Sequence, residues 1–208
     1  MYAARANIRH KNVIYHGNSL MNLASGSNTV SNGHYLSNKI HTTLVASKNY
    51  MSAVFLSING NPCATKIANW STQTLPVIKE NDVVILWEIQ NDVNAGGLTG
   101  AQAYANYVTM AGLIHGVGAK IVAVTATPRD VVGDTDQNTR NLACNSLIMA
   151  DNTNFDLKID MTTNAAFDAQ ADASNATYYL SDKLHFTTAG QDLAASIISS
   201  ALLASSLL

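Results

Sequence analysis

Two apolar stretches, residues 82–87 (DVVILW) and residues 120–125 (KIVAVT), decide the fold class of this chain. Each is a short continuous run rich in β-branched residues, which is typical of a strand buried on both faces of a sheet. Between them, residues 99–117 have the pattern of a long helix, with Thr99 placed to cap its first turn. A strand, a helix and a second strand in this order predict a right-handed crossover and a parallel sheet.

The same alternation continues on both sides of this unit. We expect further strands at residues 12–16, 51–58 and 155–161, and further helices at residues 33–44, 61–75, 137–150 and 187–203. Residues 162–181 are polar and poorly periodic, which predicts a functional loop. No repeat or linker interrupts the pattern, so residues 1–208 are predicted to form one α/β domain.

Charge and hydropathy argue against two classes of function. Charged residues make up 12% of the chain, the net charge is −2, and no stretch is rich in lysine or arginine, so nucleic-acid binding has no electrostatic basis. No apolar run reaches the roughly 18 residues that a transmembrane helix needs. Residues 1–11 lack the apolar core of a signal peptide. The composition, rich in Asn, Ser, Thr and Ala, nevertheless favours an extracellular or virion-associated protein.

The two cysteines, Cys63 and Cys144, lack the clustered spacing of a zinc site. We expect two unpaired, partly buried thiols, although a disulfide between them stays open at this point. No pair of histidines stands four residues apart with a glutamate between them, so no zinc site is expected.

Polar residues follow each predicted strand, at the edge where open α/β sheets form their ligand sites. Ser19, in the stretch HGNSL at residues 16–20, either caps a helix or acts as a nucleophile whose oxyanion the helix start would stabilise. Gly60 follows the second strand, where it either offers its N–H to a ligand or only permits a tight turn. Asn91 follows the third strand, where its amide either donates to an oxyanion or caps the next turn.

The last chemical signal is the pair Asp182 and His185, just before the predicted final helix. Serine chemistry needs a base, and histidine is the side chain that titrates near neutral pH. An aspartate three residues earlier can fold back to orient the imidazole ring and stabilise its charged form.

In this order and spacing the sequence resembles the SGNH hydrolases, also called GDSL-type esterases or lipases. The stretch HGNSL, Gly60, the stretch QND at residues 90–92 and the stretch SDKLHFTTAG at residues 181–190 look like the first, second, third and fifth blocks of that family. The resemblance implies a three-layer α/β/α sandwich with a central, mostly parallel five-stranded sheet. It also implies a catalytic triad of Ser19, Asp182 and His185, and no cofactor or metal. The implied oxyanion hole consists of the Ser19 and Gly60 N–H groups and the Asn91 side chain.

Two positions depart from the family pattern. Asn18 stands where the first block has aspartate, and Ile89 stands where the third block has glycine. A β-branched residue does not easily adopt a positive φ, so we expect the turn before Asn91 to differ. We also expect Arg129 to lie at the surface and Trp87 to lie in the core.

These features predict ester hydrolysis through an acyl-enzyme. We favour a short acyl ester, above all acetyl, on a carbohydrate, because the loops at residues 22–32, 59–61 and 162–181 are mostly polar. The polar, weakly charged chain resembles SGNH modules of secreted enzymes and of phage tail fibres. Two alternatives stay open: a lysophospholipase or broad short-chain esterase, and a non-catalytic glycan-binding module on the same fold. The expected partner is a small-molecule or glycan ester, and no oligomeric state is predicted.

Overall fold

The computed structural model describes residues 11–48, 51–94, 96–131 and 135–208. Five parallel strands form one sheet in the order β2-β1-β3-β4-β5. The strands are β1 (Lys11–Gly17), β2 (Met51–Phe55), β3 (Val83–Trp87), β4 (Lys120–Val124) and β5 (Leu157–Ile159). The order runs outward from β1 in both directions, so the chain reverses its path between β1 and β3. Ligand sites of such sheets form at this reversal, beyond the carboxyl ends of the strands.

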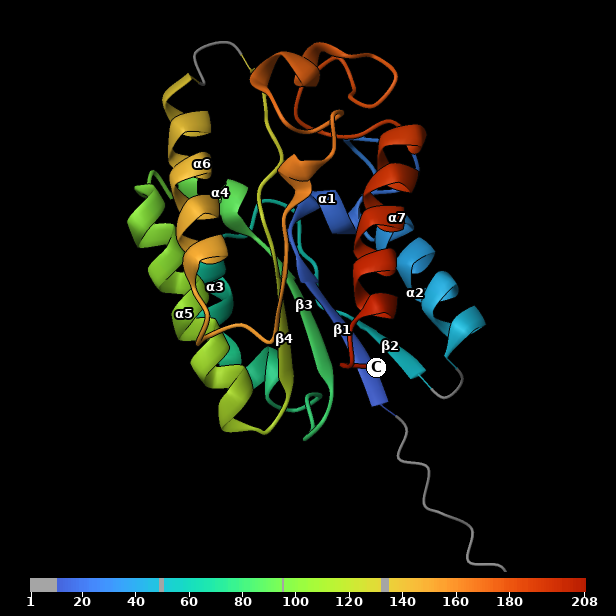
Figure 1. Cartoon of the computed structure of the whole chain (residues 1–208), viewed down its shortest axis with the longest axis vertical. Helices are drawn as coiled ribbons and strands as arrows, with labels where there is room; N and C mark the ends of the chain where they lie inside the picture. The colour runs from blue at the N-terminus through green and yellow to red at the C-terminus, as the bar shows by residue number, and fades with distance from the viewer. Residues whose placement is uncertain (1–10, 49–50, 95, 132–134) are drawn as a thin grey trace, which may run out of the picture.

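Helices cover both faces of the sheet and complete the predicted three-layer sandwich (Figure 1). One face is covered by α2 (Tyr35–Ser47) and α7 (Thr188–Ala204). The other face is covered by α3 (Cys63–Ala68), α5 (Gly100–Gly116) and α6 (Thr135–Ala150). Thr99 caps α5 as predicted, and the structure adds a capping box: the Thr99 hydroxyl accepts from the Gln102 N–H at 3.3 Å while the Gln102 side chain accepts from the Thr99 N–H at 2.9 Å.

Several short elements at the carboxyl edge of the sheet are absent from the sequence-based expectations. Two are helices of one or two turns, α1 (Ser19–Asn22) and α4 (Ile89–Asn94). The others are 3-10 turns at Met161–Thr163 and Gln170–Ser174. Where one helix was expected at residues 61–75, the structure has α3 followed by a π-helical turn at Trp70–Thr74. Elements this short show no periodicity, so only the structure reveals them.

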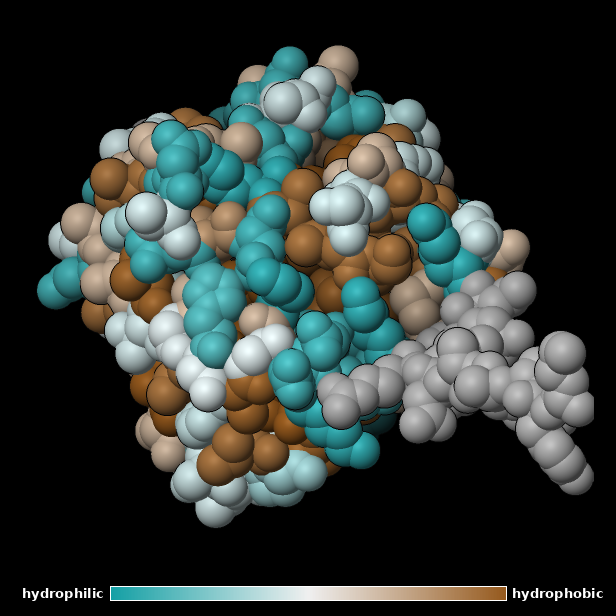
Figure 2. Space-filling model, turned by 60° about the horizontal axis from the view of Figure 1, so that its bottom comes forward, coloured by the Kyte–Doolittle hydropathy of each residue, from teal (hydrophilic) through white to brown (hydrophobic). Residues whose placement is uncertain are grey.

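Each face of the sheet carries its own apolar core, because successive strand residues point to opposite sides. In β1, Val13 and Tyr15 pack toward α2 and α7, whereas Ile14 packs toward α3 and α5. All five residues of β3 are fully buried, which accounts for its continuous apolar sequence and confirms the core position of Trp87. Figure 2 shows the end of the molecule where the strands begin, with apolar residues exposed between hydrophilic ones.

Cys63 and Cys144 are both fully buried, one in each of two helices on the same face of the sheet. Neither forms a disulfide. The expectation of two unpaired thiols is therefore confirmed, with deeper burial than expected. Among the described residues, no helix is both long and apolar enough to cross a membrane.

Candidate active site

The stretch HGNSL forms a tight strand-to-helix turn that places Ser19 at the start of α1. The turn begins at Gly17, where an added Cβ would lie 2.4 Å from the Met21 sulfur, so a larger residue does not fit without a shift. Asn18 caps the helix, because its Oδ1 accepts from the Leu20 N–H at 3.0 Å. Asparagine and aspartate cap helices about equally well, which explains why the turn forms with Asn18.

Ser19, His185 and Asp182 lie in one hydrogen-bonded line. His185 Nε2 is 2.8 Å from Ser19 Oγ, and His185 Nδ1 is 2.8 Å from Asp182 Oδ2. The other oxygen of Asp182 accepts from the backbone N–H groups of Leu184 at 3.1 Å and His185 at 3.0 Å. Lys183 adopts a left-handed φ of 55°, which lets the chain fold Asp182 back onto the ring. The structure thus brings together three side chains separated by up to 166 residues.

The surroundings of Asp182 keep it ionised. Asn28, from the loop after α1, donates to Asp182 Oδ2 at 2.8 Å. Burial by itself raises the pKa of Asp182, but the hydrogen bonds from Asn28, His185 and the nearby N–H groups together lower that pKa to about 2. The carboxylate therefore favours the imidazole form with its proton on Nδ1, which leaves Nε2 to accept the proton of Ser19.

The loop that carries Gly60 runs beside the Ser19 turn. The Ile58 N–H donates to the Gly17 carbonyl at 2.9 Å, which extends the contact with β1 past the end of β2. Gly60 adopts a φ of 74°, a conformation that favours glycine, and the space beside its Cα is open. Within the described chain, neither the Ser19 N–H nor the Gly60 N–H donates to any protein atom. Both N–H groups are therefore available to a ligand.

Asn91 lies in α4 and reaches the same loop, because its Nδ2 donates to the Asn61 carbonyl at 3.2 Å. Ile89, which stands where the family has glycine, is the first residue of α4 and is fully buried. It has no positive φ. Asp92 braces this helix, since its Oδ1 accepts from the Ala64 N–H at 3.4 Å and from Asn106 at 3.3 Å. The structure therefore places Asn91 beside the Gly60 loop, with its amide already holding a backbone carbonyl.

Two of the three polar loops expected beside Ser19, residues 22–32 and 59–61, contact each other. Asn22 donates to Asn59 Oδ1 at 2.8 Å, and Asn59 Nδ2 donates to Ser31 Oγ at 2.7 Å. The Asn32 N–H also donates to Asn22 Oδ1 at 3.2 Å. These amide contacts join the loop after α1 to the loop after β2.

The loop at residues 162–181 is anchored by aromatic packing. Tyr179 is only 2% exposed, and its ring packs edge-on against Phe167 and Phe186 with centroids 5.9 and 5.1 Å away. Tyr178 is half-buried and contacts Phe167. Tyr179 is thus a core residue, and it presents no face to a ligand.

A buried ionisable cluster beneath the site escaped sequence analysis. Glu88 Oε1 lies 3.6 Å from His16 Nδ1 and 3.8 Å from Lys66 Nζ, and all three side chains are almost fully buried. Burial raises the pKa of Glu88 well above its usual range and lowers the pKa of Lys66, while burial and then Lys66 lower the pKa of His16 to about 3. Lys66 also donates to the Leu56 carbonyl. The sequence does hold one sign of this cluster: Glu88 directly follows a buried apolar strand, and a buried charge needs a partner.

The expectation for Arg129 was wrong, because this residue is only 3% exposed. Its backbone is held by Asn138 of α6, whose Oδ1 accepts from the Arg129 N–H at 3.1 Å. Among the described residues, no three His, Cys, Asp or Glu side chains gather in a way that could hold a metal ion.

Comparison with known proteins identifies the fold. No family model and no curated protein matches the sequence. Solved structures do match: a lipase/acylhydrolase from Enterococcus faecalis has 17% identity and a TM-score of 0.65, over 91% of this chain and 94% of that one. A variant of an acetyl-xylooligosaccharide esterase from Geobacillus stearothermophilus has 14% identity and a TM-score of 0.68, over 95% and 96%. A protein assigned to the SGNH hydrolases from Slackia heliotrinireducens has 16% identity and a TM-score of 0.66, over 93% and 100%. The chain therefore has the fold of the SGNH (GDSL-like) hydrolases, as its sequence blocks predicted.

Proposed function

We propose that this chain is a serine esterase that cleaves carboxylic esters through an acyl-enzyme. Ser19 is the nucleophile, His185 the general base and acid, and Asp182 the residue that orients the imidazole. The observation that carries the proposal is the pair of 2.8 Å contacts joining Ser19 Oγ to His185 Nε2 and His185 Nδ1 to Asp182 Oδ2. This is the geometry of a nucleophile, a base and an orienting group in one line.

The reaction has two halves. His185 Nε2 takes the proton of Ser19 Oγ while that oxygen attacks the ester carbonyl, and the N–H groups of Ser19 and Gly60 stabilise the oxyanion together with Asn91. The intermediate collapses to an acyl-Ser19 ester, and His185 returns the proton to the departing alcohol. Water then repeats the sequence on the acyl-enzyme and releases the acid, while Asp182 stays ionised throughout.

The substrate we favour is a short acyl ester, above all acetyl, on a carbohydrate. Three features support this choice. The loops beside Ser19 meet through the amides of Asn22 and Asn59, which suit hydroxyl groups. The loops at residues 22–32, 59–61 and 162–181 are mostly polar. A lipase instead needs an apolar groove for the long acyl chain of its substrate, because each buried CH₂ group contributes about 0.8 kcal/mol. One structural neighbour is an esterase of acetyl-xylooligosaccharides. We further propose that the protein acts outside its cell of origin or on a virion, where such glycans are exposed.

Labelling with a fluorophosphonate tests the nucleophile. The reagent should add once, on Ser19, and Ser19→Ala should abolish both labelling and ester hydrolysis. Ser146→Ala, an exposed serine of α6 whose hydroxyl bonds only within its own helix, is the matched control and should behave like the unaltered protein. A label on another residue, or full hydrolysis by Ser19→Ala, would contradict the proposal. Glycan binding without labelling would instead support a non-catalytic binding module.

Chain-length selectivity tests the substrate. A series of p-nitrophenyl esters from C2 to C12 should show the highest kcat/KM at C2, and an O-acetylated polysaccharide should release acetate. A kcat/KM that rises steadily to C8 or beyond would favour the lysophospholipase or broad esterase alternative.

A further inference from the structure

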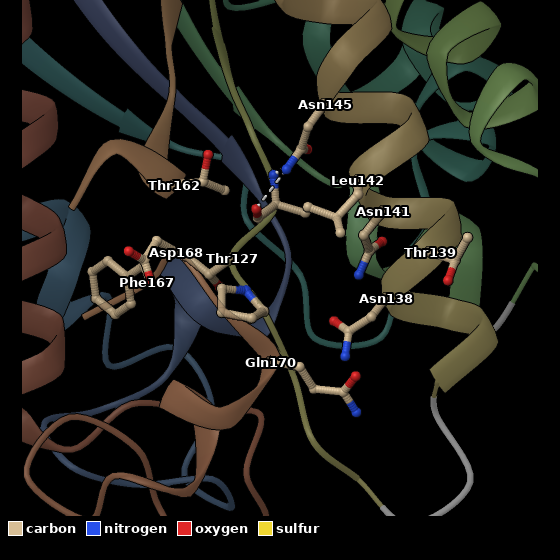
Figure 3. A pocket seen from close by; sticks show the side chains of 12 residues that line it. Thr127, Asn138, Thr139, Asn141, Leu142, Asn145, Thr162, Phe167, Asp168 and Gln170 are labelled. Carbon is tan, nitrogen blue, oxygen red and sulfur yellow. Dashed lines mark hydrogen bonds between the residues drawn. The ribbon is translucent and has the colours of Figure 1, made fainter. Parts of the chain in front are cut away.

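A pocket lies beyond the carboxyl ends of β4 and β5, between α6 and the loop that follows β5 (Figure 3). We call it the α6 pocket; its walls are residues 126–128, the face of α6 from Asn138 to Asn145, and residues 162–170. Its volume is about 120 Å³, enough for a small polar group or one side of a sugar ring but not for a sugar chain. None of its lining residues belongs to the Ser19–His185–Asp182 line.

Three asparagines of α6 face this pocket at helical spacing, Asn138, Asn141 and Asn145 (Figure 3). The two outer ones hold the chain that follows β4. The Ala126 N–H donates to Asn145 Oδ1 at 2.8 Å, and Asn145 Nδ2 donates to the Ala126 carbonyl at 2.9 Å. Asn138 makes the same pair of bonds with the backbone of Arg129. Two pairs of hydrogen bonds thus join α6 to this extended segment.

The middle asparagine has no such partner. Asn141 is 2% exposed, and neither its Nδ2 nor its Oδ1 bonds to any described atom. The backbone that runs past it explains why. Pro128 has no N–H to offer, and the Thr127 carbonyl and hydroxyl already accept from Gln90 Nε2 at 2.9 and 3.1 Å. A buried amide with both ends unpaired is unfavourable unless a ligand supplies the missing partners.

The rest of the lining defines the kind of ligand. Phe167, Pro128 and the half-exposed Leu142 supply apolar surface, while Gln170 and Thr162 add hydrogen-bonding groups. Among the described lining residues there is no lysine or arginine, and the charged one is Asp168, so an anionic group would be repelled. Apolar surface combined with uncharged amides suits the C–H and O–H groups of a neutral sugar.

Hydrogen bonds connect both walls of the pocket to the Ser19 site. Gln90, which binds Thr127, is the neighbour of Asn91 in sequence. Asp130, at the far end of the same wall, binds Lys183 Nζ at 2.7 Å and accepts from Gln170 at 3.1 Å. Lys183 is the neighbour of Asp182. The pocket and the triad therefore lie along the same edge of the sheet, joined through residues next to Asn91 and Asp182.

We propose that the α6 pocket is a subsite for a neutral sugar unit of the substrate, and that Asn141 is its specificity-determining residue. The Asn141 amide would donate to one sugar hydroxyl and accept from another, while Leu142 and Pro128 contact the ring. The inference rests on the proposed esterase function, and it adds the claim that sugar esters are recognised away from the reacting carbonyl.

Two substrates distinguish binding in the pocket from the reaction at Ser19: O-acetylated xylo-oligosaccharides, and p-nitrophenyl acetate, which carries no sugar. Asn141→Ala and the nearly isosteric Asn141→Leu should lower kcat/KM for the sugar ester about tenfold, as for lost hydrogen bonds to a neutral group, and leave p-nitrophenyl acetate unchanged. Asn141→Leu should melt at the same temperature as the unaltered protein or higher, because it removes an unpaired buried amide. Asn38→Ala, an exposed asparagine of α2, is the matched control.

The possible outcomes are distinct. Equal losses on both substrates would show that Asn141 is only structural, and unchanged kinetics on both would also overturn the subsite. Hydrolysis of p-nitrophenyl acetate without any release of acetate from the sugar would overturn it while leaving the esterase proposal intact. If no ester is cleaved, the deacetylated xylo-oligosaccharide still decides the matter, because binding should shift the NMR signals of the Asn141 side-chain amide.

Discussion

Replacing Asp92 with asparagine should stabilise the protein at neutral pH and flatten its pH dependence. Asp92 is fully buried, and its Oδ2 has no hydrogen-bond partner among the described residues. Burial raises the pKa of this carboxyl to about 6, although hydrogen bonds from Ala64, Asn106 and Cys63 oppose the change. Asparagine keeps an oxygen for Ala64 and Asn106 and carries no charge at any pH.

The sign and size of the effect follow from the difference in proton binding. In the unfolded chain an aspartate titrates near about pH 3.9. Between about pH 4 and pH 6 the folded state therefore binds more protons, so the free energy of unfolding falls as the pH rises through this window. The cost of ionising Asp92 is absent at low pH and complete above about pH 7. Two pKa units correspond to about 2.7 kcal/mol, and this cost disappears in Asp92→Asn.

Denaturant unfolding at pH 4.5 and pH 8 measures this difference. The stability of Asp92→Asn relative to the unaltered protein should increase by about 2 kcal/mol between the two pH values. Asp136→Asn, with a side chain 68% exposed, is the control and should show almost no such increase, because exposed ion pairs contribute only about 0–1 kcal/mol. Hydrolysis of p-nitrophenyl acetate should stay within a few-fold, since Asp92 contacts α3 and α5. A relative stability that is equal at both pH values would refute the reasoning.

Further variants probe the site and the residues that support it. His185→Ala should lower kcat at least about 10³-fold, and Asp182→Asn should lower it by a smaller factor, because His185 transfers two protons and Asp182 only orients the imidazole. The reverse ranking in steady-state kinetics would mean that the two roles are misassigned. Asn91→Ala should lower kcat by roughly 10²–10³ with little change in KM, and an unchanged kcat would exclude Asn91 from the oxyanion hole. Lys66→Met should lower the free energy of unfolding by about 3–5 kcal/mol, because Glu88 loses its cationic partner; denaturant unfolding measures this loss. Adding Glu88→Gln to Lys66→Met should recover much of the loss. Equal stability of Lys66→Met and the unaltered protein would contradict this expectation.

Sequence patterns were sufficient for the elements that are regular or buried on both faces. The runs that became β3 and β4 consist of residues that are almost all fully buried, so they are apolar without interruption and easy to recognise. The helix bounded by Thr99 was equally clear because its capping residues are local. In contrast, α1 and α4 are too short to show a period, and their positions follow from what they pack against.

Burial of single polar residues could not be read in the same way. Arg129 was expected at the surface because most arginines are exposed, yet its backbone is clamped by Asn138 under α6. Tyr179 is buried because Phe167 and Phe186 pack around its ring, and no local pattern predicts that contact. Burial of such a residue depends on side chains that are distant in sequence.

By itself, the sequence determined the parallel α/β architecture and the order of the four blocks that carry Ser19, Gly60, Asn91 and His185. Both are expressed in local spacing: hydrophobic runs, caps and polar residues at strand ends. Only the tertiary structure decided how far apart these groups lie, that Asn141 is left without a partner, and that Lys66 compensates Glu88. Such pairings depend on which residues of different elements face each other, and the periodicity of a single segment holds no information about the segment opposite it.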